Sequence, residues 1–112
     1  MNAGQARASF VPSHVAVICH DGPDSQAARK AAAQDHLRYV QAVLDQLALA
    51  GPLFSPDGQR MIGSLYVFKT GSLDEARRWL EADPYFAAGF WQSIDYRPFL
   101  PAAGDFVGGT IW

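Results

Sequence analysis

Three ionisable residues suggest acid–base chemistry, and two of them share one predicted helix. Arg29 and His36 stand seven positions apart, close to two turns of a helix with about 3.6 residues per turn. Ala33 and Val40 fall on the same side, which is therefore expected to face the interior. A buried arginine or histidine needs hydrogen-bond acceptors, because an unpaired polar group in the interior costs free energy. Both side chains should therefore point at acceptors on a neighbouring element.

Asp83 is the leading candidate for that acceptor. It stands at the end of a second predicted helix, in "EADPYF", where the helix dipole mildly disfavours a carboxylate unless a cation or a proton compensates it. Pro84 follows, and a residue before proline is driven into an extended conformation, which would turn Asp83 out of the helix surface. A carboxylate beside a histidine orients the ring and stabilises its protonated form, as general acid–base catalysis requires. His36 and Asp83 are therefore predicted to form a proton-transfer pair.

Two hydroxyl-bearing residues are weaker candidates. Ser64 and Tyr66 fall on one face of the predicted strand 61–69 and are candidates for lining a pocket, although ordinary polar strand residues would give the same pattern. The sequence has no glycine-rich phosphate loop and no G-x-S-x-G motif. Nucleotide binding and serine-hydrolase chemistry are therefore not expected, and the sequence predicts no cofactor.

A metal site is not expected either. His14, Cys19 and His20 are potential ligands in sequence, but the period of a strand sends Cys19 and His20 to opposite faces, and no second cluster completes a site. Cys19 is the only cysteine, so it has no disulfide partner within the chain. We interpret it as a small buried hydrophobe.

The elements that must position these residues follow from periodicity and turn signals. A long helix is predicted from 25 to 50, ending at Gly51-Pro52, with Val43, Leu44 and Leu47 on its apolar side. A shorter helix begins after Ser72, which is predicted to cap it. The predicted strands are 14–20, a short apolar segment at 52–55 that begins a hairpin, 61–69 and 90–99.

This order of strand, helix, strand, strand, helix and strand predicts an α+β fold of the ferredoxin-like βαββαβ type, with an antiparallel sheet and both helices on one face. The predicted strands have apolar residues on both faces of the sheet. The face without helices is therefore also expected to be covered. A second subunit packed sheet to sheet is the simplest solution, and we predict a homodimer.

Length and composition are those of one folded domain. The chain has 112 residues, 49% of them hydrophobic, and a formal net charge of −2, so neither a second domain nor nucleic-acid binding is expected. No apolar run is long enough for a membrane span, and the cytoplasm is the expected location.

Residues 1–12 are predicted to be a loose arm, 13–100 the domain and 101–112 a tail. Trp79, Trp91 and Trp112 are interpreted as core or interface anchors.

The sequence resembles the YCII-related (YciI-like) domain family. The resemblance rests on an ordered set of motifs: "HDGPDS", "ARKAAAQDHLRYV", "LALAGPLFSPDG", "IGSLYVF", "SLDEARRWLEADPYFAAGFW" and the closing strand. It implies a ferredoxin-like fold that assembles as a dimeric α+β barrel. By motif it also implies His36 and Asp83 as catalytic residues, with Arg29, Ser64 and Tyr85 as substrate-binding neighbours in the pocket.

The resemblance does not identify the reaction of this protein, because the biochemistry of the family is mostly unassigned and a shared fold does not establish a shared reaction. Its best-known enzymatic relative is a dehydrochlorinase of a chlorinated hydroxyquinol. Three hypotheses follow for this chain. The first is a cofactor-independent lyase or isomerase acting on phenolic, enol or lactone substrates; the second is a non-catalytic domain that binds a small ligand in the same pocket. The third is a purely structural role for the His36–Asp83 contact.

Overall fold

The computed structural model describes residues 10–112. The predicted arm at 1–12 therefore lies almost wholly outside the described residues. Within the described part, no helix is both long and apolar enough to cross a membrane.

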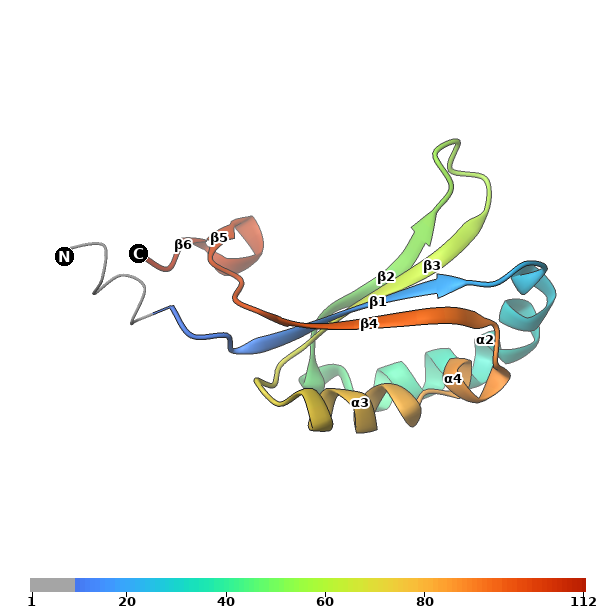
Figure 1. The fold of residues 1–112 in the computed structure, drawn as a ribbon, viewed down its shortest axis with the longest axis horizontal. Helices are drawn as coiled ribbons and strands as arrows, with labels where there is room; N and C mark the ends of the chain where they lie inside the picture. Colours follow the sequence, from blue (N-terminus) through green and yellow to red (C-terminus); the bar gives the residue numbers. More distant parts are fainter. Residues whose placement is uncertain (1–9) are drawn as a thin grey trace.

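A four-stranded antiparallel sheet forms the centre of the fold, with the strand order β2-β3-β1-β4. Its strands are β1 (His14–Asp21), β2 (Leu47–Phe54), β3 (Met61–Phe68) and β4 (Trp91–Phe99). The helices α2 (Ser25–Ala42), α3 (Leu73–Glu81) and α4 (Pro84–Ala88) all lie against one face of this sheet (Figure 1). The predicted ferredoxin-like α+β fold is confirmed.

The first helix is shorter than predicted. Helix α2 ends at Ala42, Val43 leaves the helical conformation at φ −124°, and after one 3-10 turn (Leu44–Gln46) the chain enters β2 at Leu47. Residues 47–54 alternate between half-buried and exposed, and pairing with β3 outweighs the helix propensity of Ala and Leu. The predicted helix end at 50 is therefore wrong, and so is the inward position of Leu44, which is exposed.

Strand β2 also explains how a proline fits inside a sheet. It pairs with β3 alone and is the edge strand, where Pro52 needs no partner for its missing N–H group. The short apolar segment predicted at 52–55 is therefore the second half of a longer strand.

The second helical region divides where the sequence contains Pro84. Ser72 caps α3 by accepting a hydrogen bond from the Glu75 backbone N–H at 3.1 Å, as predicted. Helix α3 ends at Glu81, and after a short break α4 begins at Pro84. The hydroxyl of Tyr39 donates to the Trp79 carbonyl at 2.8 Å, which ties α2 to α3.

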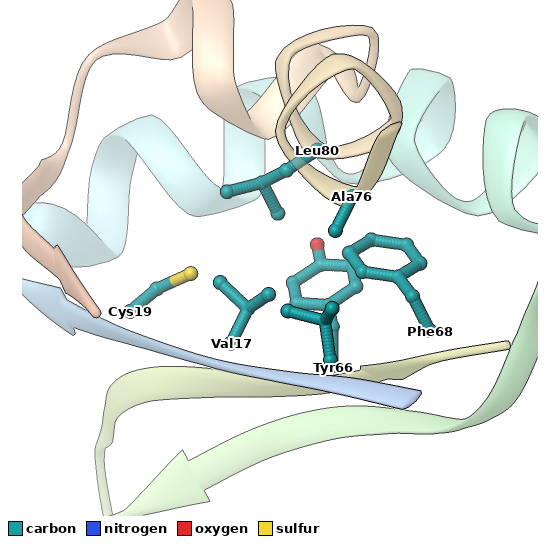
Figure 2. Packing of buried hydrophobic residues seen from close by; sticks show 7 residues of the cluster. Val17, Cys19, Tyr66, Phe68, Ala76 and Leu80 are labelled. Atoms are coloured by element: carbon teal, nitrogen blue, oxygen red, sulfur yellow. The ribbon is translucent and has the colours of Figure 1, made fainter. Parts of the chain in front are cut away.

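The core lies between the sheet and the helices. Val15, Val17 and Cys19 alternate along β1 and are fully buried; Figure 2 shows Val17 and Cys19 below Ala76 and Leu80 of α3. The core also contains Tyr66 and Phe68 of β3, and Trp79 and Trp91 pack against it. Burial raises the pKa of the Cys19 thiol to about 12, so it stays protonated and unreactive at neutral pH. The predicted packing role of this cysteine is confirmed.

The segment after β4 forms a small unit of its own. Strands β5 (Ala103–Gly104) and β6 (Gly109–Thr110) pair across one 3-10 turn, η2 (Asp105–Val107). This unit lies beyond the end of the sheet (Figure 1). Trp112 is largely exposed and faces the ring of Phe10, with 6.3 Å between the centroids.

Candidate active site

The side chains of His36 and Asp83 are in direct contact. Nδ1 of His36 lies 2.8 Å and 2.9 Å from the two carboxylate oxygens of Asp83. A carboxylate only accepts hydrogen bonds, so Nδ1 is the donor, and in the neutral ring Nε2 then has a free lone pair. Nε2 has no hydrogen-bond partner among residues 10–112. The ring is held in the tautomer that a general base requires.

Asp83 is at the start of a helix as well as near the end of one. Its backbone is extended, at φ −71° and ψ 130°, as the following proline predicts. It is the N-cap of α4, and its Oδ1 accepts the Tyr85 backbone N–H at 2.9 Å. The positive end of the α4 dipole therefore favours this carboxylate. The prediction of an unfavourable helix end is wrong because α4 begins there.

Tyr66 supplies the third hydrogen bond to the same carboxylate. Its hydroxyl donates to Asp83 Oδ2 at 2.7 Å in the core. Burial and the negative charge of Asp83 raise the pKa of Tyr66 far above its usual range, so the hydroxyl stays protonated and remains a donor. The sequence placed Tyr66 among the candidate pocket residues but gave no sign that it would hold Asp83. Three donors from three elements thus fix a carboxylate that is 1% exposed.

Tyr85 positions the histidine ring from one side. The rings of Tyr85 and His36 are stacked, with 3.7 Å between centroids and 6° between planes. Because the Asp83 contact fixes the edge of the imidazole and Tyr85 covers one face, the ring has little freedom to rotate. Burial raises the pKa of Tyr85, so its hydroxyl also stays protonated at neutral pH.

Arg29 has a different partner from the one predicted. Its Nε and Nη2 donate to the two carboxylate oxygens of Asp21, at 2.7 Å and 2.9 Å. Both side chains are almost fully buried. Asp21 is the last residue of β1 and follows an irregularity in the pairing with β4, and its carboxylate points to Arg29. The prediction of Asp83 as the acceptor for Arg29 is therefore wrong, and the sequence reasoning did not single out Asp21.

Arg29 also connects α2 to the middle of β3. Its Nη2 donates to the Gly63 carbonyl at 2.8 Å and to Ser64 Oγ at 3.0 Å. Position 63 has no room for a side chain, since a Cβ there would collide with the backbone carbonyl of Cys19. The glycine allows close approach of β1 and β3, and the next residue, Ser64, faces the helices.

A cavity of about 340 Å³ brings four of the five predicted site residues together. Arg29, His36, Ser64 and Tyr85 line it, whereas Asp83 lies behind His36 and does not reach it. Its remaining wall is mostly apolar and comes from α2, from the β2 edge strand and from β3. It includes Leu37, Val40 and Pro52, and also Tyr66, the other residue expected to line a pocket. This volume and lining suit a small, largely apolar molecule.

Other positions offer less for chemistry. A second hollow of about 480 Å³ lies at the turn between β1 and α2, near Arg60 and Met61, and none of the five predicted site residues lines it. Within the described part of the chain, no three His, Cys, Asp or Glu side chains gather in a way that could hold a metal ion. The residues that could do chemistry are concentrated in the smaller cavity.

Comparisons with known proteins identify the family of this chain. The model of the YCII-related domain matches residues 13–100. Protein YciI of Escherichia coli O6:H1 is 31% identical over 90 residues, which cover 74% of this chain and 92% of that protein. Protein YciI of Shigella flexneri matches with the same values.

The fold also occurs in a solved structure of an enzyme. It is the 5-chloro-2-hydroxyhydroquinone dehydrochlorinase TftG of Burkholderia phenoliruptrix in complex with 2,5-dihydroxybenzoquinone, with a TM-score of 0.70 and 23% sequence identity. The match covers 82% of this chain and 96% of that chain. Since the domain model spans most of the sequence and YciI exceeds 30% identity across nearly its full length, the chain belongs to the YCII-related domain family.

Proposed function

We propose that this protein is a cofactor-independent small-molecule enzyme of the lyase or isomerase type, in which His36 transfers a proton. The observation that carries the proposal is the pairing of the His36 ring with a buried carboxylate while the ring lines a cavity of about 340 Å³. The dehydrochlorinase with the same fold is an enzyme that binds a small cyclic compound, which supports the same interpretation of this cavity.

The roles of the pair follow from their environments. Nε2 of His36 takes a proton from carbon or from a phenolic oxygen, and the ring becomes positively charged. Asp83 orients the ring and balances that charge, because its carboxylate is held by Tyr66 and Tyr85 and cannot turn away. The protonated ring then returns the proton to another atom, as an isomerase requires, or the ligand loses a leaving group, as a lyase requires.

Ligand binding tests the location of the site. A panel of phenols, enol lactones and small carboxylates is screened by thermal shift against the parent protein, His36→Ala and His20→Ala. His20 is the matched control, since its side chain is about half exposed and lies on the other face of the sheet. A ligand at a hundred times its Kd should stabilise the parent by about 2.7 kcal/mol.

We expect this stabilisation in the parent and in His20→Ala, and its loss in His36→Ala. Equal stabilisation in all three proteins would place the ligand elsewhere and contradict the proposal. Binding that depends on His36 but never gives a product or proton exchange would favour the alternative, a non-catalytic ligand-binding domain.

We also propose that the protein is a homodimer that covers the second face of the sheet. The helices leave this face open in Figure 1, and the register places Ile18, Leu65 and Val67 on it beside Leu49 of the edge strand. A contiguous apolar sheet face of this kind commonly marks a surface that another protein covers.

A charge in the middle of this face should separate the subunits. Leu65→Lys is expected to halve the molar mass measured by light scattering after gel filtration, because a dimer interface would bury an unpaired charge. Leu44→Lys is the control, since Leu44 is exposed on the helix side. A monomeric parent protein, or an unchanged dimer in Leu65→Lys, would be evidence against this assembly.

A further inference from the structure

The hydroxyl of Ser64 is buried beside the cavity, and its proton is available to donate one more hydrogen bond. Ser64 is 4% exposed, and its Oγ accepts a hydrogen bond from Arg29 Nη2 at 3.0 Å. Among residues 10–112 no acceptor lies within hydrogen-bond reach of the Ser64 hydroxyl proton. A buried hydroxyl normally satisfies its donor, and Ser64 lines the cavity. An acceptor atom of a ligand would complete its hydrogen bonding.

Arg29 makes this hydroxyl a strong donor. A hydroxyl oxygen that accepts from a guanidinium donates more strongly through its own proton, because hydrogen bonds in a chain polarise one another. The guanidinium is fixed by Asp21, Gly63 and Ser64. Its Nη1 makes a long contact of 3.8 Å with the sulfur of Met61, and the guanidinium also lies 5.4 Å from the centre of the Tyr85 ring.

The charges around the cavity limit what the ligand can be. Asp21 neutralises Arg29, and Asp83 leaves one negative charge beside His36 while the ring is neutral. A ligand that enters as a neutral acid and gives its proton to His36 leaves the net charge of the site unchanged, because Asp83 balances the imidazolium and the ligand oxygen takes over the one remaining negative charge. The oxyanion then lies where a hydrogen-bond donor is already in place.

We propose that Ser64 binds the oxygen of the ligand and stabilises the negative charge that forms there, so that the site takes phenols and enolisable ketones or lactones. This inference rests on the proposed function and adds the group that receives the charge. His36 Nε2 forms a new N–H bond as the C–H or O–H bond of the ligand breaks. The electron pair of that bond ends on the ligand oxygen, as an enolate or a phenolate, next to the Ser64 hydroxyl. No oxidant, reductant or further reactant is needed.

The ionisation of a bound phenol tests this role directly. The probe is meta-fluorophenol, which has no second strong hydrogen-bonding group and whose fluorine NMR shift reports its protonation. It is titrated with pH, free and bound, with the parent protein, Ser64→Ala, Ser64→Thr and Ser93→Ala. Ser93 is the matched control, because it is exposed on the opposite face of the sheet.

We expect the bound phenol to ionise at lower pH than the free phenol in the parent protein, in Ser64→Thr, which keeps the hydroxyl, and in Ser93→Ala. In Ser64→Ala the midpoint should rise by about one pH unit, a tenfold loss of phenolate, because one hydrogen bond to the charged oxygen is lost. A merely structural role of Ser64 would change how much phenol binds but not the protonation of the phenol that is bound.

Two results would overturn the assignment of Ser64: an unchanged midpoint in Ser64→Ala, or failure of the parent protein to bind the phenol. The same titration of His36→Ala separates this inference from the proposed function. If Ser64→Ala shifts the midpoint while His36→Ala leaves it unchanged, the oxygen site stands and the role of His36 fails. If His36→Ala shifts the midpoint and Ser64→Ala leaves it unchanged, the proton-transfer role of His36 stands and Ser64 is excluded as the group that binds the ligand oxygen.

Discussion

Replacing Asp83 with asparagine is expected to slow proton transfer by His36 roughly a hundred- to ten-thousand-fold, the range that a positioned acid–base group contributes. The reason is the tautomer of the ring. The amide oxygen of asparagine can still accept the Tyr85 N–H, but its NH₂ group would then face Tyr66 and His36. The NH₂ group in place of Oδ2, 2.9 Å from His36 Nδ1, would favour the tautomer in which Nδ1 accepts and Nε2 carries the proton, and in that tautomer the nitrogen left for the ligand is no longer a base.

Two measurements detect the change of the His36 tautomer in Asp83→Asn. Nitrogen NMR of the His36 side chain should show the proton on Nδ1 in the parent and on Nε2 in the variant, and the rate of proton transfer should fall in parallel. Asp95→Asn is the control, since Asp95 faces His20 at 3.8 Å in a pair that is about half exposed. Full activity in Asp83→Asn would show that the carboxylate has no part in the reaction.

Replacing Arg29 with methionine is expected to destabilise the protein by about 3–5 kcal/mol, the range measured when one partner of a buried ion pair is removed. Asp21 would remain as a buried carboxylate without its counter-charge. The Gly63 carbonyl and Ser64 Oγ would also lose their donor. Methionine keeps much of the length and apolar volume of the side chain, so the loss of charge and hydrogen bonds dominates. Denaturant unfolding measures the difference in free energy.

The same helix supplies the control for this variant. Arg38 pairs with Asp35 at 3.1 Å, and both side chains are mostly exposed, so Arg38→Met should change stability by less than about 1 kcal/mol. Combining Arg29→Met with Asp21→Asn should cost less than the two single changes together, because the second removes the unpaired charge. Additive effects would mean that the two residues do not stabilise each other.

The sequence is sufficient to predict the contact between His36 and Asp83 and the order of the main helices and strands. Two helical turns separate Arg29 and His36, and the helical period alone places both on the inner side of the helix. Pro84 likewise predicts the extended backbone that directs the Asp83 carboxylate toward His36. These features depend on local geometry, which the sequence encodes directly.

Features that depend on pairing between distant segments do not follow from local patterns. The run "LALAGPLF" has good helix formers, and only its hydrogen bonding to β3 makes residues 47–50 a strand. The composition around Asp21 indicates a turn, whereas the partner that needs its carboxylate, Arg29, lies eight residues further along on another element. The contact of Tyr66 with Asp83 joins residues on β3 and at the start of α4, and no local pattern marks it.

The central claim is that His36 moves protons to and from a small molecule in this cavity. Solvent deuterium exchange measures that step without knowledge of the natural substrate. Cyclic ketones and lactones are incubated with the protein in D₂O, and deuterium uptake next to the carbonyl is followed by NMR. We predict that at least one compound exchanges faster with the parent protein and with His20→Ala than with His36→Ala or Asp83→Asn. Equal exchange rates with all four proteins across the panel would contradict the account.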